Sequence, residues 1–424
     1  MKEPSYHNEI FAILEEELVP AKGCTEPIAI AFAAAKAREL LKTFPKHIEI
    51  QASGNLIKNI RCVTVPNTGN LVGIEASAIA GMVGGDSHLG LEVISTITNK
   101  DLKLIHQFLY QNIVTVSLLE TPFNLHFKLY ASTEKDQIMI EIKNLHTNIV
   151  KITLNEETIF EKEEENTAYF GVETDRSFLT IERILNFANT ADFLRLKKFL
   201  IRQIHDNMAI ANKGIKGKFG VQIGQTILQY DKSIFGQIKA HTAAASEARM
   251  SGCSSSVITN SGSGNQGIAS SIPVILYAKH LGVSEEKMYR ALALSNLLTI
   301  YQKGYIGRLS AFCGAISATI SSGATITYLE GGTLDQIKMT VTNALANVSG
   351  VVCDGAKPSC ASKIATGLDA AFLGHQLAMA NKRYHPLSGI LKLTADETIT
   401  AVGKMASEGM KDTDKVILGI MLEK

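Results

Sequence analysis

The sequence predicts an α+β fold, in which a mostly helical domain carries a smaller mixed α/β domain inserted after the N-terminal helices. From His47 to about residue 170, short segments are rich in β-branched residues, and several alternate apolar with polar positions. From Phe178 onward such segments almost disappear, and Ala-rich windows at helical spacing replace them. The 424 residues, of which 46% are hydrophobic and 20% are charged, are enough for two or three globular domains.

The first 45 residues predict two helices. Residues 6–19 have apolar side chains at helical spacing, and Pro20 ends that pattern. A second helix follows over residues 25–41, with Thr25 as its N-cap and Pro27 in its first turn. Cys24 therefore precedes a helix N-terminus.

Two further domains follow along the chain. The mixed α/β domain is expected over residues 46–175, with a strand-like segment over 47–66 and helices near 73–83 and 100–111. The all-helical domain is expected over residues 176–424. Its helical windows are 179–189, 193–212, 239–250, 266–280, 285–295, 334–347 and 361–380.

Charge and hydropathy exclude several classes of protein. The 42 Lys and Arg residues against 41 Asp and Glu leave a net charge of +1, so no bulk field attracts nucleic acid or anionic lipid. The uncharged stretches 250–278 and 309–329 contain too many Gly, Pro, Ser and Thr residues to span a membrane, and we expect both to be buried. The first 17 residues lack the pattern of a secretory signal, so a cytoplasmic protein is expected.

Six cysteines without an export signal predict reduced thiols rather than a disulfide framework. Cys353 and Cys360 lie seven residues apart in VVCDGAKPSCASKIATG, and Cys313 lies forty residues earlier. Three thiolates that meet at one point would leave one iron of a four-iron cluster open to substrate. The alternative is that these cysteines are buried packing residues. Packing is the better interpretation of Cys62 and Cys253.

A glycine-rich segment, TNSGSGNQG at residues 259–267, precedes an expected helix. Free backbone N–H groups at a helix start, together with the amides of Asn265 and Gln266, favour a carboxylate or a phosphate. The segment lacks the other signatures of a dinucleotide site or a P-loop, and a tight turn between two helices explains it equally well.

Other residues also suggest chemistry. A helix N-terminus lowers the pKa of a thiol, so Cys24 could act as a base, nucleophile or ligand, although a lone cysteine there is more often inert. Lys363 could form a Schiff base with pyridoxal phosphate, or it could be a solvated helix lysine. His88 and His241 are acid/base candidates, and surface or capping positions are the simpler interpretation of both.

Six motifs together resemble the L-cysteine desulfidase family, whose helical domain is similar to the alpha part of the iron-sulfur L-serine dehydratases. The motifs occur in the family's order: PAKGCTEPIA, SGNLIKNIRCVTVPNTG, HTAAASEARMSG, TNSGSGNQGIASSIPV, IGRLSAFCGAISA and VVCDGAKPSCASKIA. The resemblance runs nearly end to end. It implies an oxygen-sensitive [4Fe-4S] lyase that converts L-cysteine to pyruvate, ammonia and hydrogen sulfide without pyridoxal phosphate.

By this resemblance, Cys313, Cys353 and Cys360 are expected to be the cluster ligands, and Cys24 to be the active-site thiol. An open iron would bind the leaving group, while Cys24 as a thiolate would remove the α-proton. The residues expected to bind the small amino-acid substrate through its carboxylate are Gly264, Asn265, Gln266, Asn67, Thr68 and Lys357. Asn67 departs from the glycine that related sequences often have.

The resemblance also implies the arrangement of the domains. A helical catalytic domain would carry the cluster, and the N-terminal helices would pack on it because Cys24 must reach the cluster. A homo-oligomer is left open, and neither nucleic acid nor membrane is expected as a partner. The alternatives are an iron-sulfur L-serine dehydratase, a pyridoxal enzyme that uses Lys363, and a non-enzymatic iron or redox sensor.

Overall fold

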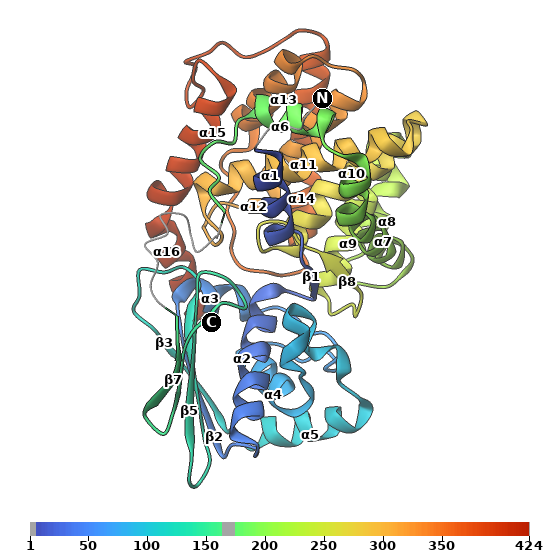
Figure 1. Cartoon of the computed structure of the whole chain (residues 1–424). Helices are drawn as coiled ribbons and strands as arrows, with labels where there is room; N and C mark the ends of the chain where they lie inside the picture. The colour runs from blue at the N-terminus through green and yellow to red at the C-terminus, as the bar shows by residue number, and fades with distance from the viewer. Residues whose placement is uncertain (1–5, 163–173, 424) are drawn as a thin grey trace.

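The computed structural model describes residues 6–162 and 174–423, which form a smaller α/β unit and a larger helical unit (Figure 1). This arrangement confirms the expected α+β fold. The smaller unit contains α2 (Thr25–Leu41), β2 (His47–Ala52), α3 (Gly54–Ile60), α4 (Ile74–Gly84), the 3-10 segment η1 (Ser87–Thr96), α5 (Asn99–Tyr110), β3 (Val114–Leu118), β4 (His126–Ser132), β5 (Gln137–Lys143), β6 (Ile149–Leu154) and β7 (Glu157–Glu161).

The larger unit is helical except for one short strand. Its long central helices include α11 and α12, which have almost no exposed side chains. The unit contains α1 (His7–Glu17), α6 (Ile181–Thr190), α7 (Phe193–Lys216), α8 (Ile223–Tyr230), α9 (Ile234–Met250), β8 (Ser256–Ile258), α10 (Gly264–Leu281), α11 (Glu285–Ile306), α12 (Gly314–Leu329), α13 (Leu334–Val348), α14 (Cys360–Met379), α15 (Ala395–Lys404), the π-helical turn η2 (Met405–Gly409) and α16 (Lys411–Leu422).

One six-stranded sheet organises the smaller unit. Its strand order is β3-β2-β4-β5-β6-β7, and all neighbours are antiparallel except β2 and β3. Ile50, Leu129 and Ile140 are neighbours in register and fully buried, whereas Lys128 and Glu141 lie on the opposite face. Alternation places one apolar face toward the helices. Helices α2 and α4 lie beside that face in Figure 1, and both contact strands of the sheet.

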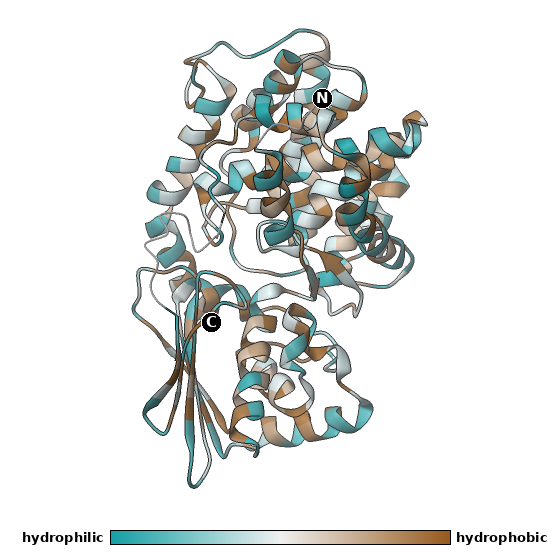
Figure 2. Ribbon diagram, in the orientation of Figure 1, coloured by the Kyte–Doolittle hydropathy of each residue, from teal (hydrophilic) through white to brown (hydrophobic). Residues whose placement is uncertain are grey.

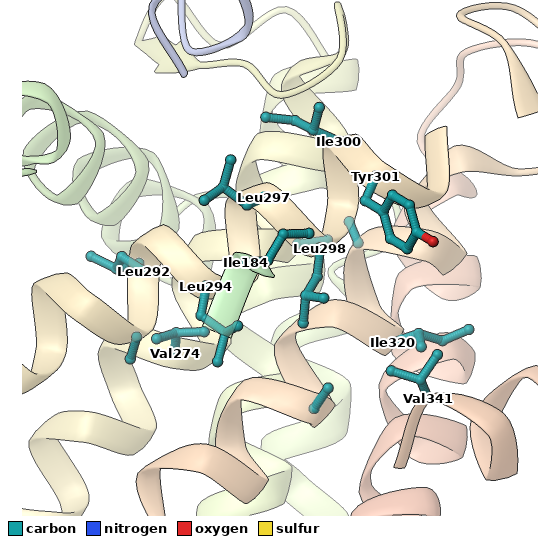
Figure 3. Close-up of a cluster of buried hydrophobic side chains, with 14 of the residues drawn as sticks. Ile184, Val274, Leu292, Leu294, Leu297, Leu298, Ile300, Tyr301, Ile320 and Val341 are labelled. Carbon is teal, nitrogen blue, oxygen red and sulfur yellow. The ribbon is translucent and has the colours of Figure 1, made fainter. Parts of the chain in front are cut away.

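The larger unit has its own hydrophobic core. Side chains from α6, α10, α11, α12 and α13 meet there, and Figure 3 labels Ile184, Val274, Leu298, Ile320 and Val341 among them. All five are buried. Figure 2 shows many apolar residues along the helices of this unit. The weakly charged, small-residue sequence of α12 is thus the sequence of a core helix, as the sequence analysis expected for residues 309–329.

The two N-terminal helices pack in different hydrophobic cores. Side chains of α1 join the core of the helical unit, whereas α2 belongs to the core of the α/β unit. For α2 this differs from the expectation that both helices pack on the helical domain, because its Ala- and Ile-rich face covers the sheet. Between them, β1 (Pro20–Lys22) pairs antiparallel with β8. This pairing attaches the segment before Cys24 to the helical unit.

Several local expectations differ from the structure. The strand expected over 47–66 ends at Ala52 and continues as helix α3, which leaves Cys62 exposed rather than packed. Cys24, not Thr25, is the N-cap residue of α2. Helices α8, α15 and α16 and strand β8 had not been expected. Within residues 6–162 and 174–423, no helix has the length and apolar character that crossing a bilayer requires.

Candidate active site

A cavity of about 90 Å³ lies where the two units meet. Its lining residues come from the start of α2, from α3, from the β5–β6 loop and from five segments of the helical unit. They are Cys24, Glu26, Asn59, His146, Arg249, Gly262, Ser263, Asn265, Gln266, Lys303, Arg308, Leu309, Ser310, Phe312, Cys313, Gly314, Ala315, Cys353, Gly355, Ala356 and Cys360. All four cysteines that the sequence analysis singled out for chemistry therefore line one cavity.

Three of these cysteines sit at adjoining turns of the helical unit. Cys313 is the N-cap residue of α12, and Cys360 is the first residue of α14. The backbone N–H of Cys313 donates to the carbonyl of Val351 over 3.0 Å, and that of Cys353 donates to the carbonyl of Ala311 over 2.6 Å. These two hydrogen bonds hold the Cys313 segment beside the Cys353 segment. Cys313 and Cys353, forty residues apart in the sequence, thereby lie on neighbouring segments.

The donor set suits a cofactor that binds thiolates. Burial, together with the neighbouring Cys353 and Cys360 thiols whose charges would repel, raises the pKa of Cys313 to about 12. Burial and Cys353 also raise the pKa of Cys360. A bound cation reverses this effect, because it stabilises the thiolates that otherwise repel each other. The three thiols on one cavity wall fit an iron-sulfur cluster.

The three thiols do not form a site for a single ion. Among the residues that the structure describes, no three Cys, His, Asp or Glu side chains lie close enough to hold one metal ion. In a four-iron cluster each thiolate binds a different iron, so the ligands of a cluster need not approach one another as closely as those of a single ion do.

Contacts from both units hold the loop between Cys353 and Cys360 in place. Gly355 has φ +92°, and a Cβ there would lie 2.5 Å from the carbonyl oxygen of Lys58, so only glycine fits. The buried ammonium of Lys58 donates to the carbonyl of Cys353 over 3.2 Å and pairs with Asp414 on α16. Helix α3 of the α/β unit is thus tied to the cysteine loop.

Asp354 forms ion pairs with both lysines of this segment. It pairs with Lys357 over 2.5 Å and also with Lys363, whose ammonium donates to the carbonyl of Val352 over 2.8 Å. Neither lysine lines the cavity. Lys357 therefore does not occupy the position expected of a substrate-carboxylate ligand, and Lys363 is not placed for a Schiff base in this cavity.

Cys24 lies at the start of α2, and its Sγ donates to Oε2 of Glu26 over 3.0 Å. Glu26 also accepts hydrogen bonds from Thr25 Oγ1 at 3.1 Å and from Asn59 Nδ2 at 3.2 Å. Burial raises the pKa of Cys24 well above its ordinary value, and the Glu26 carboxylate raises it further. The lowering expected at a helix N-terminus is reversed, because burial disfavours the thiolate and the nearby carboxylate adds to this effect.

The glycine-rich segment reaches the cavity through Asn265 and Gln266, both of which are buried. Asn265 Oδ1 accepts from Arg249 Nη1 and from Ser246 Oγ, each over 3.1 Å. Gln266 Oε1 has no hydrogen-bond partner among the described residues. Gly264 packs behind this wall, where a Cβ would lie 2.3 Å from Nε of Arg249.

Four other candidates lie outside the cavity. Thr68 is fully buried and donates to the carbonyl of Val65, and Asn67 donates to the carbonyl of Ile94. Neither belongs to the cavity lining, and the expectation that they bind substrate stays a prediction. His88 is exposed in η1, and the ring of His241 donates to the carbonyl of Gln237 in its own helix.

The charged residues that line the cavity were not predicted from the sequence. Arg308 donates to Glu17 over 2.7 Å, whereas Arg249 has no carboxylate partner among the described residues. Burial lowers the pKa of Lys303 to about 8, and burial lowers that of His146 to about 4, so His146 is neutral at pH 7. One sequence feature could have identified Arg249: it is a charged residue in the otherwise Ala-rich helix segment HTAAASEARMSG.

Comparisons with known proteins agree on one family. The family model described as "Serine dehydratase alpha chain" matches residues 88–419, a range that includes Arg249, Cys313, Cys353 and Cys360 but not Cys24. A "UPF0597 protein" of Treponema denticola is 45% identical over 99% of both chains. One of Finegoldia magna is 46% identical over 97% of this chain and 99% of its own. One of Bacteroides fragilis is 35% identical over 99% of both.

Proposed function

This chain belongs to the serine dehydratase alpha chain family, and from that premise we propose that it is a [4Fe-4S]-dependent lyase. Its reaction would eliminate sulfide from L-cysteine and give pyruvate, ammonia and hydrogen sulfide. The observation that carries the proposal is the presence of Cys24, Cys313, Cys353 and Cys360 on the wall of a single cavity. Three of these thiols would hold the cofactor, and the fourth remains for catalysis.

Cys313, Cys353 and Cys360 are the proposed cluster ligands. When bound there, the cluster would supply a Lewis-acidic iron for the leaving group of the substrate. The protein's own contribution is to hold three turns together through the Cys313–Val351 and Cys353–Ala311 backbone hydrogen bonds. The buried ammonium of Lys303 supplies positive charge beside Cys353 and Cys313.

Cys24 is the proposed base that takes the α-proton, with Glu26 as its partner. The thiol is protonated at rest, because burial and Glu26 raise its pKa. Its proton passes along the 3.0 Å hydrogen bond to the Glu26 carboxylate, and the resulting thiolate then accepts the α-proton of the substrate. The electron pair of the broken C–H bond forms the new double bond, and the Cβ–S bond breaks. Hydrolysis of the resulting aminoacrylate gives pyruvate and ammonia.

The cavity also contains groups that orient an amino acid. Gly264, Asn265 and Gln266 remain proposed for the carboxylate side, since Asn265 and Gln266 line the cavity directly. Neutral His146 approaches from the β5–β6 loop of the α/β unit, and its Nε2 has no hydrogen-bond partner among the described residues. The substrate would thus be enclosed by side chains of both units, which excludes water from the reacting atoms.

The second candidate function is an iron-sulfur L-serine dehydratase, which is favoured by the description of the matching family. The two activities share every residue named above and differ in whether sulfide or hydroxide leaves. Steady-state kinetics with L-cysteine and L-serine on anaerobically reconstituted enzyme decides between them through kcat/KM. Pyruvate release from neither amino acid would reject both candidates and would favour a sensor.

A pyridoxal mechanism is tested in the same preparation. We expect bleaching of the cluster by air or chelator to abolish turnover, and we expect borohydride to trap no Schiff base at Lys363. Activity that survives cluster loss but not Lys363→Ala would overturn the proposal. We further propose that the enzyme works in the cytoplasm, which keeps thiols reduced; all six cysteines are free.

A further inference from the structure

Arg249, near the C-terminus of α9, is a buried guanidinium with unused hydrogen-bond donors. Its side chain is among the largest that are fully buried, and the residue is 1% exposed. Nη1 donates to Oδ1 of Asn265 over 3.1 Å. Within the described part of the chain, Nε and Nη2 have no hydrogen-bond partner. Burial of a guanidinium in this state costs free energy, because neither its charge nor its unused donors can interact with water.

The two unused nitrogens lie on the same edge of the guanidinium plane. The Nε–H and Nη2–H bonds of arginine point side by side, and together they match the two oxygens of a carboxylate. The third nitrogen is held by Asn265, which fixes the plane of the group. Arg249 is therefore oriented for bidentate recognition of one carboxylate.

The other arginine of the cavity provides a contrast. Arg308 donates to Glu17 over 2.7 Å, and Glu17 also pairs with Arg176 over 2.6 Å. Arg176 also pairs with Glu16 over 2.9 Å, so two carboxylates balance the two guanidinium groups within the protein. No acidic side chain pairs with Arg249 in the described residues, although both arginines line the same cavity. The unbalanced charge at Arg249 leaves a place for an anion from outside the chain.

Gly264 explains how the guanidinium fits beside the start of α10. A Cβ at this position would lie 2.3 Å from Nε and 2.6 Å from Cζ of Arg249, so any other residue would displace the guanidinium from its present position. Gly264 of the TNSGSGNQG segment thus makes room for Arg249. The segment contributes to a carboxylate site by making room for a side chain, in addition to any backbone N–H groups.

We propose that Arg249 binds the α-carboxylate of the amino-acid substrate through Nε and Nη2, an inference that rests on the proposed lyase function for the identity of its ligand. The carboxylate enters from the cavity and supplies the negative charge that Arg249 lacks. Asn265 holds the guanidinium in place, and Gly264 gives it room. With the carboxylate fixed there, the remainder of the substrate extends toward the part of the cavity that is lined by Cys24 and the other cysteines.

The first test changes the ligand and leaves the protein intact. Calorimetric titration of the full-length chain, anaerobically reconstituted, with L-alanine and with L-alaninamide compares an unreactive substrate analogue with its counterpart that lacks the carboxylate charge. We expect L-alanine to bind and L-alaninamide to bind about tenfold to 100-fold more weakly, because a hydrogen bond to a charged group is lost. Equal affinity for both ligands, or no binding of L-alanine, would overturn the inference.

The second test changes the arginine. Arg249→Gln should weaken L-alanine binding by a similar factor, and Arg249→Lys should restore part of it as a point charge without the bidentate fork. Arg202→Gln, at a side chain that is 50% exposed, is the matched control and should bind like the wild type. Near-UV circular dichroism and cluster absorbance establish that each variant is folded and loaded. Wild-type affinity in folded Arg249→Gln would overturn the assignment.

These outcomes separate the inference from the proposed function. Arg249-dependent binding of L-alanine by a protein that releases no pyruvate from L-cysteine or L-serine would keep the carboxylate site and reject the lyase. Normal turnover with an unchanged KM in Arg249→Gln would keep the lyase and reject the carboxylate site. If Arg249 instead served only to stabilise the Cys24 thiolate, kcat and its pH profile would change, while the affinity for L-alanine would not.

Discussion

The Cys24 thiol donates a hydrogen bond to the Glu26 carboxylate, with 3.0 Å between Sγ and Oε2. One residue, Thr25, separates them at the start of α2, so the helix itself fixes their spacing. The carboxylate keeps the thiol protonated and also offers the acceptor for its proton. A thiol and a carboxylate in this arrangement can act as one proton-transfer unit.

We expect Glu26→Gln to lower kcat about 100-fold or more, because the amide cannot take the proton from Cys24. Cys24→Ala should abolish turnover. Both variants should keep the cluster absorbance of the wild type, since neither residue is a proposed ligand. Glu15→Gln, at an exposed position of α1, is the control and should be fully active. Wild-type turnover in Glu26→Gln would remove Glu26 from the mechanism.

Replacing any of the three proposed ligands should prevent cluster assembly. After anaerobic reconstitution, Cys313→Ser, Cys353→Ser and Cys360→Ser should contain far less iron and sulfide than the wild type. The matched controls are Cys62→Ser, at an exposed position, and Cys253→Ser, which is buried in a separate small hydrophobic cluster. Equal iron in all five variants would show that another set of ligands holds the metal.

The ion pairs of Glu17 predict a pH-dependent stability difference. Burial would raise the pKa of Glu17, but Arg308 and Arg176 outweigh it and hold the pKa below its ordinary 4.5. The ionised carboxylate therefore contributes stability that is present above pH 4.5 and is lost as the pH falls through the lower folded pKa.

Glu17→Gln should thus cost about 3 kcal/mol or more at pH 7, because it leaves buried guanidinium groups without their partner. Below pH 4.5 the two proteins should converge as Glu17 of the wild type becomes protonated. Urea unfolding at several pH values measures this. The control is Glu161→Gln, at a surface pair with Lys151. A difference that stayed constant with pH would contradict the account.

Lys58 should stabilise the contact between the two units. Lys58→Met removes the partner of Asp414 and the donor to the Cys353 carbonyl, and we expect a loss of about 2 to 4 kcal/mol. Lys46→Met, which breaks an exposed pair with Glu134, should cost less than about 1 kcal/mol. Urea midpoints compare the two variants. Equal midpoints would mean that the Lys58 contact carries no stability.

Much of the fold could be predicted from local pattern. Strands β4 and β5 alternate apolar with polar residues because one face packs in the core with α2 and the other is mostly half-buried. Helix α12 was expected to be buried because its sequence lacks charge. Residues 54–60 were misassigned as strand, since GNLIKNI contains β-branched isoleucines and lies between two strand-like segments. Their helix lies against α16, a contact that local pattern does not contain.

The site could be predicted where its chemistry depends on the type of residue, and less well where it depends on which side chains form pairs. Cys24, Cys313, Cys353 and Cys360 were identified from thiols and spacing. Arg249, Glu26 and His146 were not, because a charged residue stands out only when its partners, or their absence, can be seen. The pKa of Cys24 was expected to be lowered by its position at a helix start, but burial and the Glu26 side chain raise it. Pairing of this kind depends on rotamers that the sequence does not specify.

The most direct test of the central claim is a paired measurement on the anaerobically reconstituted enzyme. Iron and acid-labile sulfide are counted per chain, and pyruvate and released sulfide are then followed with L-cysteine as substrate. The account predicts about four irons and four sulfides per chain, with pyruvate and sulfide formed in equal amounts and only by protein that carries the cluster. Protein with a complete cluster that forms no pyruvate from L-cysteine or L-serine, or equal activity in protein without iron, would contradict it.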